Sequence, residues 1–76
     1  MKIAIIGLGY VGIQLAIVFA RQHETIGFDV DENKLDAYRL GSDPTGEVSR
    51  LELSSATNLR FTAESSELVG CDIYII

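Results

Sequence analysis

The sequence predicts an α/β fold in which a parallel sheet is built from strands joined by helices. Two observations carry this prediction. Short β-branched runs alternate along the chain with segments of helical periodicity, and the first apolar run passes directly into three closely spaced glycines. Strands that alternate with helices are joined by right-handed crossovers and therefore lie parallel. We expect the first part of a doubly wound sheet, made of βαβ units with strand order 3-2-1-4.

The first two elements are the clearest. Residues 2–6, KIAII, form a β-branched run too short for a helix and are predicted to be a buried strand. A helix follows from about Tyr10 to Arg21, and it is so apolar that we expect it to be covered on more than one side. Its apolar positions at helical spacing are Val11, Leu15, Val18 and Phe19, with Ile13, Ala16, Ile17 and Ala20 on the flanks.

The remaining elements continue the alternation. A second helix is predicted to begin after Asp31, which can cap it, and to run to about Leu40. Ser49 and Glu52 have the spacing of a capping box, which indicates a further short helix. The other expected elements are a strand at 25–30, a loop at 42–47, a short helix at 47–56, a strand at 59–62, one or two helical turns at 63–70 and a strand at 72–76.

Composition limits the function classes. The chain has 76 residues and a net charge of −5, so it is at most one small domain and lacks the basic stripe of a nucleic-acid surface. It has no run of about 18 apolar residues for a membrane span, and its single cysteine excludes an internal disulfide. We therefore expect a soluble cytoplasmic protein without nucleic-acid or membrane partners. Because the sequence stops directly after the strand pattern CDIYII, we expect it to be the N-terminal piece of a longer protein.

The three glycines fit a known pattern, G-x-G-x-x-G, after a strand and at the opening of a helix. Gly7 allows the tight turn out of the strand, Gly9 lacks the Cβ that would keep a pyrophosphate away from the backbone, and Gly12 lets the helix approach the sheet. The amides around Tyr10 and Val11, at the positive end of the helix dipole, then face an anion. The simpler alternative is a tight connection without a ligand.

An acidic residue completes the dinucleotide-binding (Rossmann) fingerprint. Asp29 follows Gly7 by about 20 residues and closes the second predicted strand. A carboxylate there accepts both hydroxyls of the adenosine ribose and repels a 2′-phosphate, so we predict that the chain binds NAD in preference to NADP. Lys34, one turn into the second helix, is either a solvated side chain or a second contact to that ribose.

No catalytic or metal-binding residue is predicted. His23 has no acid or serine partner in the pattern and is expected to be a loop residue. Cys71 stands at the entry to a strand, where a small buried residue is ordinary, and no spacing suggests a metal site. The predicted chemistry is therefore limited to holding a dinucleotide.

The segments MKIAIIGLGYVG and TIGFDVDENKL together resemble the N-terminal domain of the UDP-glucose/GDP-mannose dehydrogenase family. GSDPTGEV, NLRFT and CDIYII make the chain most similar to the branch that oxidises UDP-N-acetylhexosamines for polysaccharide biosynthesis. The resemblance covers essentially residues 1–76. Matched by position, it implies that Gly7, Gly9, Tyr10, Val11 and Gly12 hold the NAD pyrophosphate, that Asp29 holds the ribose and that Lys34 lies beside it.

The resemblance also implies what the rest of the protein does. Members continue into a substrate domain with a nucleophilic cysteine, and they oxidise the C6 alcohol of a UDP-sugar to a carboxylate with two NAD. Cys71 matches no part of that cysteine motif, and Gln14 replaces a proline found in many members. The implied intact protein is a homo-oligomer. Two alternatives stay open, another NAD-dependent dehydrogenase of the hydroxyacid or hydroxyacyl-CoA type, and a non-catalytic nucleotide-sensing module.

Overall fold

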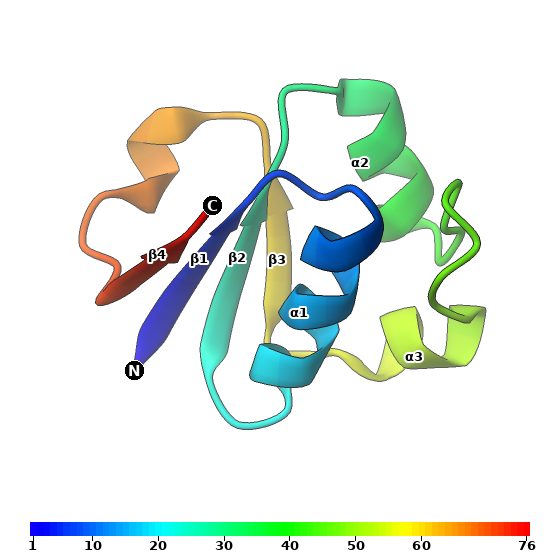
Figure 1. Ribbon diagram of the computed structural model, residues 1–76, viewed down its shortest axis with the longest axis horizontal. Helices are drawn as coiled ribbons and strands as arrows, with labels where there is room; N and C mark the ends of the chain where they lie inside the picture. Colours follow the sequence, from blue (N-terminus) through cyan, green and yellow to red (C-terminus); the bar gives the residue numbers. More distant parts are fainter.

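Four parallel strands form one sheet in the order β3-β2-β1-β4 (Figure 1). The computed structural model describes residues 1–76. Strand order and parallel pairing confirm the predicted first part of a doubly wound sheet. In chain order the elements are β1 (Lys2–Ile6), α1 (Tyr10–Ala20), β2 (Glu24–Phe28), α2 (Glu32–Arg39), α3 (Arg50–Ser55), β3 (Leu59–Thr62), the 3₁₀ helix η1 (Ser65–Leu68) and β4 (Ile73–Ile75).

β1 lies at the middle of the sheet and pairs with β2 on one side and β4 on the other. Its residue Ile3 is opposite Thr25 of β2 and Ile73 of β4. The chain therefore leaves β1 toward one side to reach β2 and returns to the other side with β4. In sheets of this kind the reversal creates a crevice at the carboxyl ends of the strands, where ligands bind.

Most predicted elements are confirmed, with corrected bounds. The turns expected at 63–70 are the shorter 3₁₀ helix η1, and the strand expected at 72–76 is the shorter β4. β2 ends at Phe28 rather than at residue 30, because the Asp29 carboxylate accepts a hydrogen bond from the Asp31 amide and turns the chain toward α2. α3 begins at Arg50 rather than at residue 47, because Ser49 and Glu52 form the predicted capping box at that point. Asp31 caps α2 as expected.

The apolar residues of α1 at the expected helical spacing are buried unevenly. Leu15 and Phe19 are partly buried and pack against the core, whereas Val11 and Val18 are 68% and 50% exposed. The face on the sheet is instead the one counted as a flank, and it carries two alanines. Because Gly12, Ala16 and Ala20 are each four residues apart, they form a stripe of small side chains along which α1 can approach the sheet closely. The buried residues of α1 are Ile13, Ala16, Ile17 and Ala20.

The two faces of the sheet are covered unequally. On one face, α1, α2 and α3 pack over the larger core cluster, which includes Ile3 and Ile5 of β1 (Figure 1). On the other face, Ala4 and Ile26 are covered by Leu68 of η1 in a much smaller cluster. Successive strand residues alternate between faces, which explains why neighbours in β1 belong to different clusters. None of the helices has the length and apolar character needed to cross a membrane.

Candidate functional site: the turn between β1 and α1

The turn from β1 into α1 contains two glycines whose places no other residue could fill without strain or overlap. Gly7 has a φ of +96°, in the left-handed region that side chains with a Cβ rarely adopt. A Cβ on Gly12 would overlap the backbone carbonyl oxygen of Gly7. The first glycine therefore permits the turn, and the third permits the first turn of α1 to pack directly against it, as the sequence predicts.

Gly9 differs from these two because nothing in the chain occupies the space beside it. A Cβ built on this residue has no heavy atom within 4 Å, and its backbone is extended with a φ of −79°. Gly9 is also the N-cap of α1, and no side chain caps the helix there. The chain itself thus gives no packing reason for a glycine at this position.

The first turn of α1 presents backbone donors that the protein leaves unpaired. The amide groups of Tyr10, Val11 and Gly12 have no acceptor in the chain, whereas the next amide, that of Ile13, bonds to the Gly9 carbonyl. Unpaired amides at a helix N-terminus, together with the positive end of the helix dipole, attract an anion such as a phosphate. No acidic side chain in this turn opposes that attraction.

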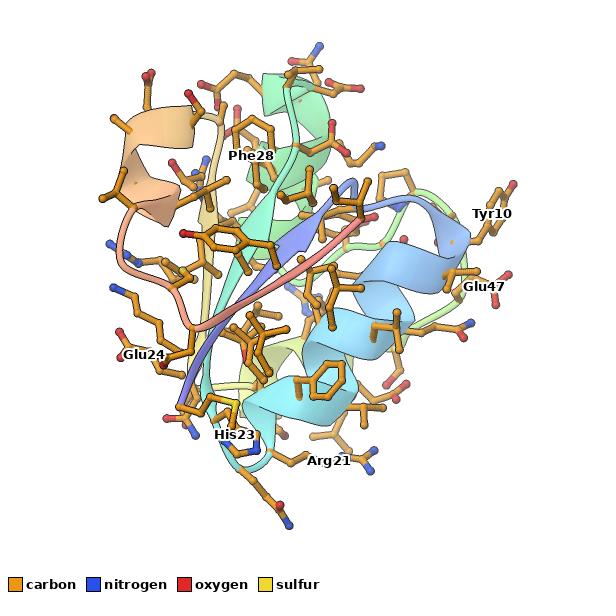
Figure 2. The ribbon with its side chains drawn as sticks, turned by 60° about the vertical axis from the view of Figure 1, so that its left-hand side comes forward. Tyr10, Arg21, His23, Glu24, Phe28 and Glu47 are labelled. Carbon is orange, nitrogen blue, oxygen red and sulfur yellow. The ribbon has the colours of Figure 1, made fainter.

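The side chains of Tyr10 and Val11 point away from the core. They are 63% and 68% exposed, and Figure 2 shows Tyr10 projecting from the start of α1. The predicted contribution of these two residues to a pyrophosphate site comes from their backbone amides, which are available.

Asp29 lies at the end of β2, next to the glycine turn. Its Oδ2 atom accepts hydrogen bonds from the Leu8 amide at 2.9 Å and from Lys34 Nζ at 3.1 Å, while Oδ1 accepts one from the Asp31 amide at 2.9 Å. Burial by itself raises the pKa of this carboxyl, but the bonds from Asp31, Leu8 and Lys34 outweigh it and hold the pKa below its ordinary value of 3.8. Asp29 is therefore a carboxylate at neutral pH.

The Asp29 carboxylate has little acceptor capacity left. A carboxylate offers about four lone-pair positions, and three donors from this chain already use it. One position remains on Oδ1, so a ribose could give it one hydroxyl unless Lys34 moves away. The Lys34 ammonium lies 3.1 Å from Oδ2, beside the same carboxylate. The structure thus brings Asp29 and Lys34 together, where the sequence left Lys34 either solvated or beside the ribose, and it leaves Asp29 a free position for one hydroxyl rather than for the expected two.

A crevice of about 330 Å³ opens between the glycine turn and the end of β4. It lies where the strand order reverses, at the carboxyl end of β1. Glycine backbone forms one wall and aliphatic side chains form the rest, so the crevice suits a ligand with a charged end at α1 and a flat apolar part beside β4. Its lining residues are Ile5, Ile6, Gly7, Gly9, Val11, Gly12, Leu15, Ile75 and Ile76.

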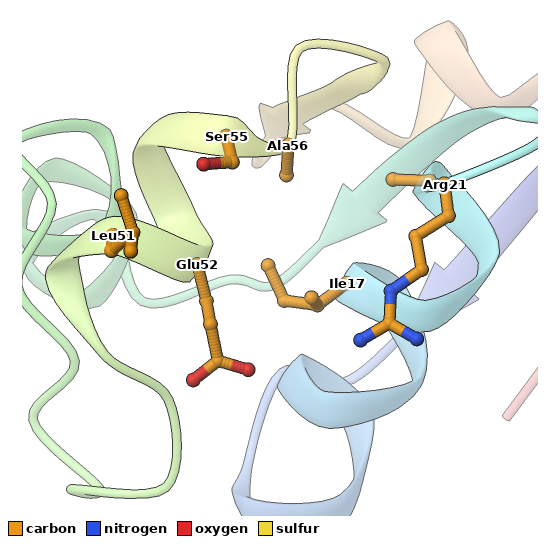
Figure 3. Close-up of a pocket in the computed structure, with 7 residues that line it drawn as sticks. Ile17, Arg21, Leu51, Glu52, Ser55 and Ala56 are labelled. Atoms are coloured by element: carbon orange, nitrogen blue, oxygen red, sulfur yellow. The ribbon is translucent and has the colours of Figure 1, made fainter.

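A second hollow of about 270 Å³ lies between the C-terminal end of α1 and α3 (Figure 3). Ile17 of α1 and Arg21, the residue after α1, line it on one side, and Leu51 and Glu52 of α3 line it on the other. It is at the opposite end of α1 from the glycine turn and shares no residue with it.

The chain holds no group of three or more His, Cys, Asp or Glu side chains that could bind a metal.

One residue of the site is not found by sequence reasoning. Tyr38 of α2 is buried and donates a hydrogen bond from its hydroxyl to the carbonyl of Leu8, between the first two glycines. The available signal is weak. Leu35 and Tyr38 have the spacing of a buried helix face, and a buried tyrosine hydroxyl needs a partner. Nothing in the sequence names a carbonyl 30 residues away as that partner.

The chain is similar in sequence to known dehydrogenases. A UDP-N-acetyl-D-glucosamine 6-dehydrogenase of Salmonella typhi is 42% identical over 76 residues, and the enzyme of the same name from Pseudomonas aeruginosa is 38% identical over 76 residues. Each alignment covers 100% of this chain but 18% of the relative, so the chain spans less than a fifth of their length.

The fold has a solved counterpart. A UDP-glucose dehydrogenase from the archaeon Pyrobaculum islandicum superposes with a TM-score of 0.76 at 28% identity, over 97% of this chain and 19% of that one. Residues 1–76 match the family described as the UDP-glucose/GDP-mannose dehydrogenase family, NAD binding domain. A domain of this kind requires a glycine turn, free amides at the start of a helix and an acidic residue after the second strand, and this chain has all three. The chain belongs to this family.

Proposed function

We propose that residues 1–76 are the N-terminal part of the NAD-binding domain of a nucleotide-sugar 6-dehydrogenase. The observation that carries this proposal is the set of three unpaired amides at the start of α1, next to the open space at Gly9. In this reading the rest of the domain and a substrate domain lie in the remainder of the protein. The substrate we propose is a UDP-N-acetylhexosamine, as in the names of the similar enzymes from Pseudomonas aeruginosa and Salmonella typhi.

The residues present fit an NAD molecule. Its pyrophosphate would lie against the amides of Tyr10, Val11 and Gly12, at the place where Gly9 leaves room. Its adenosine ribose would reach Asp29 and Lys34, one hydroxyl to the free position on Asp29 Oδ1 and the other to the Lys34 ammonium or to a vacated position on Oδ2. A 2′-phosphate would meet the negative Asp29 at this point, which favours NAD over NADP.

The proposed reaction converts a primary alcohol into a carboxylate. The change removes four electrons and needs one water, so two NAD each accept a hydride, and three protons are released. This chain's own part is to bind and orient the dinucleotide, since it brings no nucleophile or general base to the crevice. We also propose that the protein is a cytoplasmic homo-oligomer. The net charge of −5 does not favour a nucleic-acid partner.

An activity assay on the complete protein tests the proposal. UDP-N-acetylglucosamine, UDP-N-acetylmannosamine, UDP-glucose and GDP-mannose are each supplied with NAD, and the NADH and sugar acid formed are measured. The proposal predicts two NADH for each UDP-N-acetylhexosamine oxidised and slower turnover of the other sugars. If the protein binds NAD but forms no NADH with any nucleotide sugar, the proposed activity is wrong.

A further inference from the structure

A buried tyrosine from α2 reaches the glycine turn from beneath. Tyr38 is 2% exposed, its ring stacks on Phe61 with 5.5 Å between ring centroids, and its hydroxyl donates to the Leu8 carbonyl at 2.7 Å. The ring is thus packed in the core, while the hydroxyl forms a hydrogen bond with a backbone carbonyl of the turn. A role limited to filling the core would not require this hydroxyl.

Leu8 is held at more points than the glycines beside it. Gly7 and Gly9 each have one backbone hydrogen bond, whereas Leu8 is held by its buried side chain, by the bond from its amide to Asp29 and by the bond to its carbonyl from Tyr38. Removing any of the three leaves the turn between the two glycines less restricted.

The hydrogen bond from Tyr38 also orients the amide of Gly9. The Leu8 carbonyl and the Gly9 N–H belong to the same planar trans peptide, so they point in opposite directions. Because the carbonyl points inward to the buried hydroxyl, the Gly9 N–H points outward, and it has no acceptor in the chain. It is therefore a further unpaired amide, next in the chain to those of the first turn of α1.

Tyr38 acts as a donor at any working pH. Burial raises the pKa of its hydroxyl to about 12, and the negative charges of Asp43 and Asp29, together with a hydrogen bond to the Asp43 carboxylate, contribute to the rise. The phenol stays protonated, and its oxygen lies 2.7 Å from the Leu8 carbonyl oxygen.

We propose that Tyr38 is a positioning residue for the dinucleotide, which fixes the Leu8–Gly9 peptide so that the Gly9 amide is aimed at the cofactor pyrophosphate. The inference rests on the proposed NAD-binding function. It adds a residue of α2, remote from the glycine motif in sequence, to the machinery that shapes the phosphate site.

The test is Tyr38→Phe in the complete protein, a change that keeps the ring and its stacking and removes only the hydroxyl. Since one buried hydrogen bond is lost, we expect the Kd and KM for NAD to rise about three- to tenfold, with kcat at saturating NAD nearly unchanged. Hydrogen exchange of the segment 7–12, measured without nucleotide, should be faster in the variant.

Thr25→Val is the matched control. Thr25 is fully buried and its hydroxyl donates to the His23 carbonyl at 3.0 Å, at the other end of β2 from the glycine turn. The control should lower the Tm by a similar amount but leave the KM for NAD and the exchange of residues 7–12 at wild-type values.

The outcomes separate the two proposals. Wild-type NAD binding with the same KM in Tyr38→Phe, or the same KM rise in Thr25→Val, would overturn the role of Tyr38 and leave the proposed function standing. A wild-type protein that binds no NAD would contradict the proposed function itself.

Discussion

At the scale of single residues, the three glycines of the turn have separate tasks. Gly7 supplies a left-handed backbone, and Gly12 supplies the space taken by the Gly7 carbonyl oxygen. Gly9 has ordinary backbone angles and empty surroundings, so its lack of a side chain serves something outside the chain. Structural and ligand-related requirements can therefore be separated by changing one glycine at a time.

Gly9→Ala should weaken NAD binding without affecting stability, whereas Gly12→Ala should lower stability. In Gly9→Ala the new Cβ stands in open space, so the Tm should stay near the wild-type value while NAD binding weakens by tenfold or more, on the order of the loss of a well-made phosphate contact. In Gly12→Ala the new Cβ meets backbone that cannot move without shifting α1, so unfolding should become easier by about 1–3 kcal/mol or more.

Thermal unfolding and NAD titration of both variants check this prediction. Unchanged NAD affinity in Gly9→Ala would mean that the turn is a packing device, and a stable Gly12→Ala would show that α1 is not in close contact with the turn.

At the scale of elements, α1 shows where sequence reasoning stops. The helix is apolar on nearly every side, so its periodicity could not indicate which side faces the sheet, and the residues expected on its flanks are the most buried. The packing is decided by Gly12 and the two alanines that continue its line, because the closest approach to the sheet is possible only along small side chains. The contact of Tyr38 with Leu8 is equally hidden, since it joins positions that only the folded sheet brings together.

Elements whose local chemistry decides them were predictable. β1 and β3 are confirmed at both ends, and Asp31 and Ser49 cap their helices through hydrogen bonds that the sequence spacing indicates. The end of β2 was missed because Val30 extends the apolar run, although it is 80% exposed. The glycines and Asp29 lie together at the turn, as their spacing in the sequence indicates, but the sharing of Asp29 among three donors is a tertiary feature.

The buried face of α1 can be tested by placing a leucine on each of its two sides. Ala16→Leu adds volume where the helix meets the sheet and should destabilise the protein by about 1–3 kcal/mol. Val18→Leu makes a smaller change on the exposed side and should alter stability by about 0.5 kcal/mol or less. Urea unfolding of both variants decides the matter, and similar losses in the two would contradict the packing described.

The loop between α2 and α3 is organised by one carboxylate. Asp43 accepts hydrogen bonds from the hydroxyl and amide of Thr45 and from the amides of Glu47 and Val48. Burial raises the pKa of this carboxyl, but the bonds from Thr45, Val48 and Glu47 outweigh it and hold the pKa below its ordinary value of 3.8. The Asp43 charge is therefore part of what holds the loop.

Asp43 should make stability dependent on acid. Because its pKa is lower in the folded chain than in the unfolded chain, its contribution is complete above the ordinary pKa and is lost as the pH falls below it. Asp43→Asn should lower the free energy of unfolding at neutral pH by about 1–3 kcal/mol. As the pH falls below the ordinary pKa, the variant should lose less of its remaining stability than the wild type loses. Denaturant unfolding from neutral pH to below the ordinary pKa measures this pH dependence. Asp36 is an exposed carboxylate, so Asp36→Asn is a control whose stability should follow the wild type at each pH.

At the scale of the whole molecule, the sheet has an open edge at β4 and a thinly covered face under η1. β4 pairs only with β1, and its residues Ile73 and Tyr74, together with Ile76, are exposed. An apolar strand with an unpaired edge invites pairing with another chain. The face under η1 is covered by one small cluster, which adds little to stability.

Residues 1–76 expressed alone should therefore self-associate or be only marginally stable, and should oxidise no UDP-sugar. Light scattering over a range of concentrations measures the association, and Ile73→Lys, which places a charge on the edge strand, should reduce it. A stable monomer at all concentrations, or NADH formation by this segment alone, would contradict the account of the edge or the placement of the catalytic residues elsewhere.

The glycine turn and Asp29 are proposed to form one site for NAD. Calorimetric titration of the complete protein with NAD and with NADP, in the wild type and in Asp29→Ala, measures this. We expect the wild-type protein to bind NAD more tightly than NADP by roughly tenfold or more, since Asp29 repels the added phosphate, and we expect Asp29→Ala to narrow the difference. Equal affinities in the wild type, or a preference that survives the loss of Asp29, would contradict this proposal.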